Sequence, residues 1–158
     1  MNVKRIVCAV LVLCLLPAFA FADLFDEAIL YYDAFANQLG VDQMPENFTD
    51  EAATTGMAHR TYNLPSSIKV IYSFDNNEVC GVSVVCLDDN YLDFLGVCCA
   101  GAFSVMKQIP YFMFGDILTQ FLEVRSGKET EVESGNNYAY QVFALNNGII
   151  CFSLSVSR

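Results

Sequence analysis

The sequence is poor in the residues that most enzyme centres need. Its 158 residues include a single histidine, His59, and no C-x-x-C, G-x-S-x-G, G-x-G-x-x-G, P-loop or D-x-D-x-D-G pattern. Zinc, serine-hydrolase, nucleotide and calcium-loop chemistry therefore have no support in the sequence. We expect no cofactor and no metal, and no residue is predicted to be catalytic.

The first 22 residues have the three parts of an export signal. Lys4 and Arg5 form the charged start, residues 6–16 the apolar run, and residues 20–22 a small-x-small cleavage site. An uncleaved membrane anchor is the alternative, but an apolar run of 11 residues is shorter than the roughly 20 that cross a bilayer. We therefore expect cleavage before Asp23 and a secreted or periplasmic protein.

Basic residues are scarce, and cleavage would remove two of the eight. The remaining 136 residues would carry six basic and 18 acidic groups, a net charge of −12. Nucleic acids and anionic membrane surfaces repel such a chain. The expected partners therefore include no nucleic acid and, after cleavage, no membrane.

Cleavage would also leave five cysteines: Cys80, Cys86, Cys98, Cys99 and Cys151. Five is an odd number, and all five lie within apolar runs, so we expect mainly buried free thiols that pack as small hydrophobic groups. If any pair is oxidised, the candidate is Cys80 or Cys86 with Cys151 on a neighbouring strand.

Three stretches have the apolar spacing of helices: 23–39, 91–106 and 111–124. The second contains Gly96, Gly101 and several other small residues, which allow close backbone contact, so we expect it to be buried at the centre of the domain. In the third, five large residues are predicted to face inward: Phe114, Ile117, Leu118, Phe121 and Leu122.

Turn-forming residues divide the rest of the chain into strands. The expected strands are 57–64, 68–74, 78–87, 138–145 and 149–156, with a short edge strand at 130–133. Residues 41–56 show no periodicity and have the composition of a surface loop. The strand 78–87 is apolar on both faces, which favours a central place in the sheet.

The order of these elements predicts one α+β domain at residues 23–158. We expect an antiparallel, hairpin-built sheet of about five strands with an N-terminal helix and a central helix pair packed on it. The element order is α-β-β-β-α-α-β-β.

Two groups of polar residues could carry chemistry. Asp88, Asp89 and Asp93 could form a weak calcium site or an acid and base pair. Capping of the helix that follows explains Asp88 and Asp89 without any such role. His59 stands alone in the weakest strand and is interpreted as a surface or hairpin residue.

Two classes of function remain. The protein is expected to be a non-catalytic binding or protein-interaction module, since the residues of common hydrolytic, metal and nucleotide chemistry are missing. The alternative is a small extracytoplasmic enzyme that uses carboxylate, tyrosine or thiol groups outside any known motif. The shape of the pockets should discriminate the two classes.

The second face of the sheet is the predicted interaction surface. Its residues are small, weakly apolar and nearly uncharged, with Lys69 at the margin: Ile71, Ser73, Ser83, Val85, Ser153 and Ser155. A face so short of charge is typical of a docking surface or a homodimer contact. The alternative is that the first helix covers this face and makes a three-layer domain.

Overall fold

The computed structural model describes residues 24–52, 57–75, 78–108, 110 and 112–157. These residues form three helices and one antiparallel sheet in the order α-β-β-β-β-α-α-β-β-β. The predicted α+β class is confirmed, although the sheet has seven strands and not about five. The predicted export signal at residues 1–22 lies outside the described residues.

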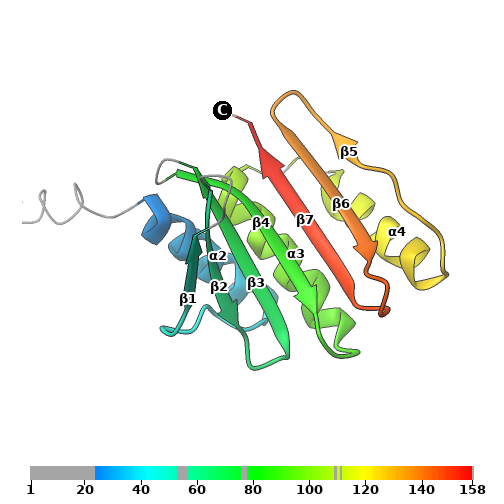
Figure 1. Cartoon of the computed structure of the whole chain (residues 1–158), viewed down its shortest axis with the longest axis horizontal. Helices are drawn as coiled ribbons and strands as arrows, with labels where there is room; N and C mark the ends of the chain where they lie inside the picture. Colours follow the sequence, from blue (N-terminus) through cyan, green and yellow to red (C-terminus); the bar gives the residue numbers. More distant parts are fainter. Residues whose placement is uncertain (1–23, 53–56, 76–77, 109, 111, 158) are drawn as a thin grey trace, which may run out of the picture.

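The strands are β1 (Thr49–Ala52), β2 (Ala58–Asn63), β3 (Ile68–Asp75), β4 (Glu78–Cys86), β5 (Glu133–Ser134), β6 (Tyr138–Ala144) and β7 (Ile150–Val156). They lie side by side in the order β1-β2-β3-β4-β7-β6-β5 (Figure 1). The doubly apolar strand β4 is the middle strand, as its composition predicts. The last strand of the chain, β7, lies directly beside it.

The two edge strands were the parts of the sheet that sequence reasoning placed poorly. Residues 41–56 were expected to be a loop, but residues 49–52 of this segment pair with β2 as strand β1. The charge of Asp50 is compensated across the strands, because Arg60 donates to it from Nε at 2.6 Å and from Nη2 at 2.9 Å. A short polar edge strand of this kind has no apolar alternation to reveal it. At the other edge, β5 begins three residues later than predicted.

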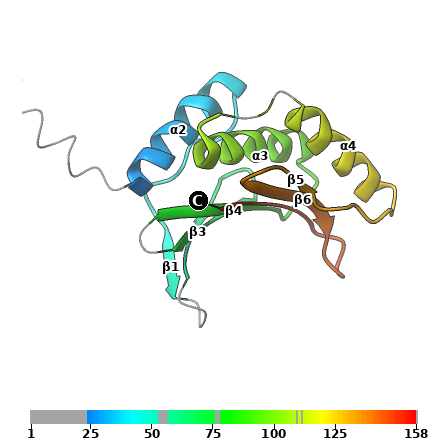
Figure 2. The same ribbon diagram turned by 90° about the horizontal axis from the view of Figure 1, so that it is seen from above.

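The helices α2 (Leu24–Leu39), α3 (Tyr91–Met106) and α4 (Met113–Arg125) all lie on one face of the sheet, with α3 between the other two (Figure 2). Helix α2 packs on α3, where the rings of Phe35 and Phe103 stack with centroids 4.8 Å apart. The interpretation in which this first helix covers the second sheet face is therefore wrong. None of the described helices is both long and apolar enough to cross a bilayer.

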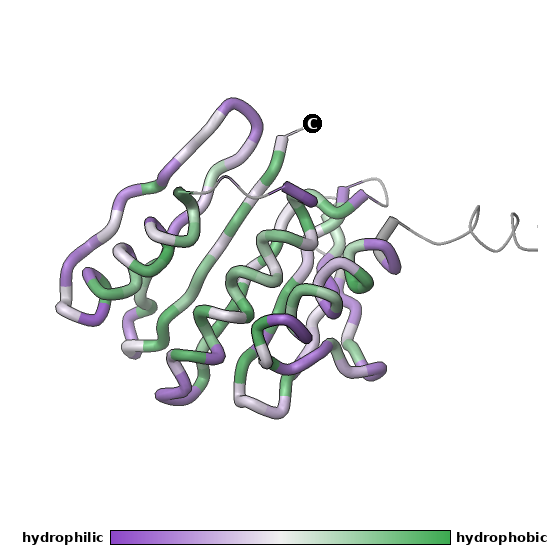
Figure 3. The backbone as a smooth tube through the Cα atoms, turned by 180° about the vertical axis from the view of Figure 1, so that it is seen from behind, coloured by the Kyte–Doolittle hydropathy of each residue, from purple (hydrophilic) through white to green (hydrophobic). Residues whose placement is uncertain are grey.

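Helix α3 is hydrophobic along most of its length, and its small residues bring it close to its neighbours (Figure 3). A Cβ atom on Gly101 would lie 3.3 Å from Cγ2 of Val82 in β4, and one on Gly96 would lie 2.5 Å from Cγ1 of Val41. The buried Ser104 hydroxyl donates to the carbonyl oxygen of Gly101 at 2.7 Å and bonds the Tyr72 hydroxyl at 2.8 Å. The predicted central position of this helix is confirmed.

The side of helix α4 that faces the sheet agrees with the prediction only in part, since Ile117 and Phe121 are buried as predicted. Its buried residues are Met113, Ile117, Gln120, Phe121 and Val124. Three residues expected to face inward are instead exposed: Phe114 by 36%, Leu118 by 45% and Leu122 by 56%. The helix carries apolar residues on two sides, so periodicity alone could not determine which side faces the core.

Candidate interaction surface

The strand register places the six predicted surface residues on the face opposite the helices. Residues that pair directly in an antiparallel sheet project to the same side. Ile71 pairs with Ser83, which pairs with Ser153. The neighbouring rows complete the set: Ser73, Gly81 and Ser155 in one, Val85 and Cys151 in the other. The sequence therefore identified the central rows of this surface, which we call the open face.

The open face extends over two further strands that the prediction did not include. From β2 it includes His59 and Thr61, which pair with Ser73 and Ile71. From β6 it includes Ala139, Gln141 and Phe143, which pair with the open-face residues of β7. Their alternation along each strand was present in the sequence, but only the strand order shows that they join the surface. None of the described helices lies over this face (Figure 2).

The polar side chains at the centre of the open face bond one another. The Ser83 and Ser153 hydroxyls lie 3.1 Å apart, and Nδ1 of His59 lies 3.1 Å from the Ser73 hydroxyl. Covering a polar group is costly when its hydrogen bonds to water are lost without replacement. Because these groups already have hydrogen-bond partners within the protein, another molecule can cover the face at little cost in free energy.

An irregularity between β3 and β4 shapes a hollow in this face. The register shifts between Ser73 and Phe74, so Cys80 leaves the buried row in which alternation had placed it. Its thiol donates to the carbonyl oxygen of Ser73 at 3.3 Å. The hollow has a volume of about 470 Å³. It is lined mainly by small residues: Ser73, Cys80, Gly81, Ser83, Ser153 and Ser155, with Met57, Asp75, Leu154 and Val156 around them.

Charged groups stand around the open face and not at its centre. Asp75 lines one end of the hollow and is exposed, and Glu51 of β1 pairs with His59 at the edge of the face. Lys69 lies at the opposite ends of the strands. The side that holds the hollow is therefore bordered by carboxylates.

The sheet is not flat. Figure 2 shows its ends, β1 and the turn between β6 and β7, curving away from the helices. The open face is accordingly the inner side of a shallow arch. A convex object fits this surface better than a flat one.

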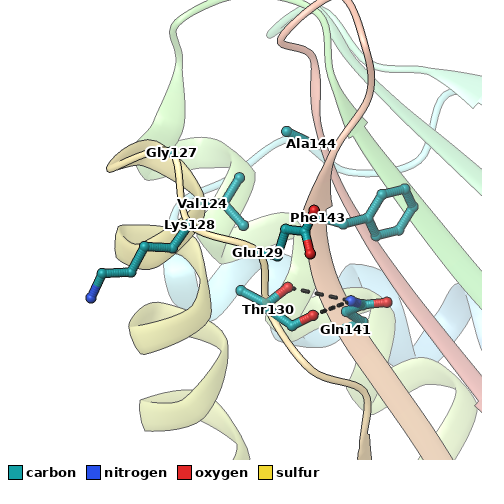
Figure 4. Close-up of a pocket in the computed structure, with 8 residues that line it drawn as sticks. All are labelled: Val124, Gly127, Lys128, Glu129, Thr130, Gln141, Phe143 and Ala144. Atoms are coloured by element: carbon teal, nitrogen blue, oxygen red, sulfur yellow. Dashed lines mark hydrogen bonds between the residues drawn. The ribbon is translucent and has the colours of Figure 1, made fainter.

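A second hollow lies between β6 and the segment that follows α4 (Figure 4). It has a volume of about 330 Å³. The Gln141 amide donates to the carbonyl oxygen of Thr130 at 2.7 Å, while Lys128 and Glu129 extend in different directions. The Thr130 hydroxyl also bonds the carbonyl oxygen of Val142. These contacts attach the segment to the edge of β6, and no ionisable groups converge there.

Two of the three predicted carboxylates, Asp88 and Asp89, border a third hollow, of about 270 Å³. Asp89 accepts a hydrogen bond of 2.5 Å from the Tyr91 hydroxyl, and Asp93 accepts one of 2.6 Å from the Asn90 amide. The N-cap of α3 is Asn90, the last residue of the polar stretch 88–90 that was predicted to cap the helix, and its side chain makes no hydrogen bond to the helix backbone. Asp88 and Asp89 precede the cap. Among the described residues, no three His, Cys, Asp or Glu side chains are placed to hold a metal ion.

The five cysteines among the described residues form no disulfide with one another. Cys86 pairs with Ile150 and Cys151 with Val85, so the two cysteines project to opposite faces and cannot bridge. Burial raises the pKa of Cys151 to about 11 and that of Cys99 to about 12, and it raises the pKa of Cys86 as well. Thiols with raised pKa values stay protonated at neutral pH and are poor nucleophiles.

One row of the open face has the residue types of a hydrolytic triad. Glu51, His59 and Ser73 occupy paired positions on β1, β2 and β3. The sequence did not indicate this grouping, because the three residues are far apart in the chain and β1 was not predicted. The row lies on an open surface, whereas catalytic triads work in sites that exclude water and present donors to the developing oxyanion.

Comparison of the chain with protein families, with curated proteins and with solved structures found no match. The surface must therefore be interpreted from its own geometry.

Proposed function

We propose that the protein is an exported, non-catalytic interaction module whose open face binds another protein. The observation that carries this proposal is a sheet face over which no described helix lies, which has almost no charge and whose central polar groups bond one another. Solvent-facing sheet surfaces are usually polar and charged. A surface whose dehydration costs little free energy is suited to binding.

The shape and the border of the face indicate the kind of partner. An α-helix about 10 Å across fits an arched surface, and large apolar side chains on it can enter the hollow of small residues. The carboxylates of Asp75 and Glu51 favour basic residues beside that apolar stripe. The proposed partner therefore presents an amphipathic helix with apolar residues at helical spacing and lysine or arginine on its flanks.

A model peptide tests this proposal directly. A fluorescent helical peptide of leucine and lysine, with leucine at i, i+3, i+4 and i+7, should bind the protein, as measured by fluorescence anisotropy. A scrambled peptide of the same composition should bind much more weakly, because it has the same charge but no apolar stripe. Equal binding of the two peptides would show attraction by net charge alone and would contradict the proposal.

Ser83→Lys examines the location of binding. A lysine at the centre of the open face should weaken binding of the leucine and lysine peptide by about tenfold or more, through repulsion and lost contact. Its melting temperature should change little, because Ser83 is only half-buried. Gln38→Lys adds the same charge on the exposed side of α2 and should bind as the natural protein does. A Ser83→Lys protein that keeps full affinity would exclude the open face.

Hydrolysis through the row of Glu51, His59 and Ser73 is the second candidate function. It is favoured by the 3.1 Å contact between Nδ1 of His59 and the Ser73 hydroxyl, which resembles a nucleophile and its base. An activated ester such as para-nitrophenyl acetate provides the test. We expect the natural protein and Ser73→Ala to hydrolyse it at the same slow rate, and a clear loss in Ser73→Ala would favour the enzyme.

Export is a separate part of the proposal and rests on residues 1–22 alone. The protein recovered from the extracytoplasmic fraction should begin at Asp23 when its N-terminus is sequenced. Material that begins at Met1, or that stays in the membrane pellet after a salt wash, would contradict cleavage.

A further inference from the structure

His59 can make the charge of the open face depend on pH. It is the only histidine of the chain, and histidine is the residue type that ordinarily gains a positive charge as the pH falls from about 7.5 to about 5.5. Carboxylates and thiols ordinarily change their charge outside this range. A change of pH over this interval therefore acts on the open face mainly through one side chain.

The two neighbouring strands place partners beside this ring. His59 is half-buried in β2, and it pairs with Glu51 of β1 on one side and with Ser73 of β3 on the other. Its Nδ1 atom lies 3.1 Å from the Ser73 hydroxyl oxygen. Residues that pair in this way project to the same side of the sheet, so all three belong to the open face.

The charged groups around His59 on this side of the sheet are carboxylates. Besides Glu51, Asp75 of β3 lines the hollow, and Glu78 of β4 pairs with Asp75. The thiol of Cys80 lines the same hollow. None of the described helices lies over this face, so no charged group of a described helix approaches the ring from above (Figure 2).

The basic residues of β2 and β3 lie elsewhere. Arg60 follows His59 in β2 and so projects to the opposite side of the sheet, where its Nε donates to Asp50 at 2.6 Å. Lys69 lies at the opposite ends of the strands. A proton on His59 would therefore introduce a positive charge into surroundings that are otherwise neutral or negative.

Protonation changes the charge of the ring and the direction of its hydrogen bond. In a neutral ring Nδ1 can accept a hydrogen bond from the Ser73 hydroxyl, whereas in a protonated ring both nitrogens are donors. Nδ1 then donates to the Ser73 oxygen, and the hydroxyl hydrogen of Ser73 turns away from the ring. The contact is kept in both states, so the fold does not have to change when the open face gains its charge.

A positive charge at this position opposes a basic partner. It repels the lysine or arginine side chains beside the apolar stripe of the proposed helix, and it offsets the charge of Glu51 that attracts them. Covering a charged imidazole also costs more free energy than covering a neutral one. We propose that protonation of His59 releases the partner, so that the open face binds its helix near neutral pH and loses it in mildly acidic surroundings. This inference rests on the proposed function, because it needs a basic partner on the open face.

The leucine and lysine peptide tests this switch, because lysine ordinarily keeps its charge over the whole interval and only the protein changes. Its dissociation constant is measured by fluorescence anisotropy at about pH 7.5 and at about pH 5.5. For the natural protein the dissociation constant should be at least about fivefold higher at the lower pH. Circular dichroism at both pH values checks that the protein stays folded.

Two substitutions of His59 separate this residue from every other titrating group. His59→Gln can still bond the Ser73 hydroxyl but cannot gain a proton in this range, so its dissociation constant should be the same at both pH values. His59→Lys is positively charged throughout, so it should bind weakly at both. Gln38→His adds a histidine on the exposed side of α2 and should respond to pH as the natural protein does.

The outcomes distinguish this inference from the proposal on which it rests. A natural protein that does not bind the peptide even at the higher pH would refute the partner site itself, and the switch with it. Equal binding at the two pH values would overturn the switch alone. A His59→Gln protein that loses affinity in acid as the natural protein does would also overturn it, because the carboxylates of the border would then carry the pH dependence.

Discussion

A single glycine determines how closely the central helix approaches the sheet. Gly101 faces Val82, and a Cβ atom there would already lie within 3.3 Å of a valine methyl group. We predict that Gly101→Leu lowers the free energy of unfolding by about 1–3 kcal/mol, because the larger side chain overpacks a filled interior. Urea denaturation measures this change. A midpoint that is unchanged or higher would mean that this side of α3 is not in contact with the sheet.

Gln120 is a residue whose role the sequence does not reveal. Its side chain is 6% exposed, its oxygen accepts a hydrogen bond of 2.7 Å from the Val142 amide, and its nitrogen donates to the carbonyl oxygen of Glu131 at 3.2 Å. Because β5 is too short to pair with this part of β6, Gln120 occupies the place of a missing strand. A glutamine in a helix usually faces water, so only the sheet edge explains its burial.

We predict that Gln120→Leu lowers the free energy of unfolding by about 1–3 kcal/mol. The leucine fits the buried position but leaves the Val142 amide without an acceptor. Hydrogen exchange of that amide should also become faster, which a simple packing defect elsewhere would not cause. Gln38→Leu on the exposed side of α2 is the control, and equal stability of the two variants would contradict the role of Gln120.

At the scale of elements, the sequence identified the helices and the five longer strands from apolar spacing and turn residues. It did not reveal β1, because the strand is polar and its Asp50 depends on Arg60 in the next strand. It also assigned Phe114, Leu118 and Leu122 to the core, since size and hydrophobicity were the only guides. The partner of a helix face is a property of the assembled sheet, and a local pattern contains no information about it.

The open face was predicted only in part for a related reason. Alternation identifies the two sides of each strand, so it predicts the open-face residues of β3, β4 and β7 once β4 is placed at the centre of the sheet. His59 and Gln141 belong to the same surface through strand order, which the sequence does not specify. The bulge that moves Cys80 into the hollow has no sequence signal beyond the neighbouring glycine.

The helices provide a pair of substitutions with the same chemistry and different outcomes. Gly115→Ala should raise the free energy of unfolding by roughly 1 kcal/mol, since alanine favours the helix and its methyl group meets nothing. Gly96→Ala gains the same propensity but forces Val41 to move, so its effect should be clearly less favourable. Thermal denaturation at low protein concentration compares the two. Equal stabilisation by the two substitutions would mean that Val41 does not lie in close contact with α3.

For the whole molecule, buried thiols predict sensitivity to alkali. Folding raises the pKa of Cys99 to about 12 and of Cys151 to about 11 from an ordinary value of 9.0, and burial raises the pKa of Cys98 in the same direction. The unfolded chain therefore loses these protons first as the pH rises above about 9. Below that pH the thiols should leave the free energy of unfolding unchanged. Above it, the free energy of unfolding should fall until the thiols of the folded protein also ionise.

Chemical denaturation between pH 7 and about 11 measures this dependence. Cys99→Ala should reduce the slope, because one of the thiols with a raised pKa is removed. A free energy of unfolding that rises with pH above 9 would contradict the sign of the argument. Reductants should leave the stability unchanged, since the five described cysteines form no disulfide with one another.

The position of β7 beside β4 also determines when the sheet can be completed during synthesis. The hydroxyls of Ser83 and Ser153, 70 positions apart in the chain, meet at the centre of the sheet, and the strand that closes this contact ends at Val156. A growing chain can assemble β1 to β4 as a meander, but β4 cannot gain its second neighbour until β7 has been synthesised. Long-range pairing of this kind makes folding slow. Until β7 has been synthesised, one edge of β4 has no partner strand, so the unfinished chain offers that edge to other chains.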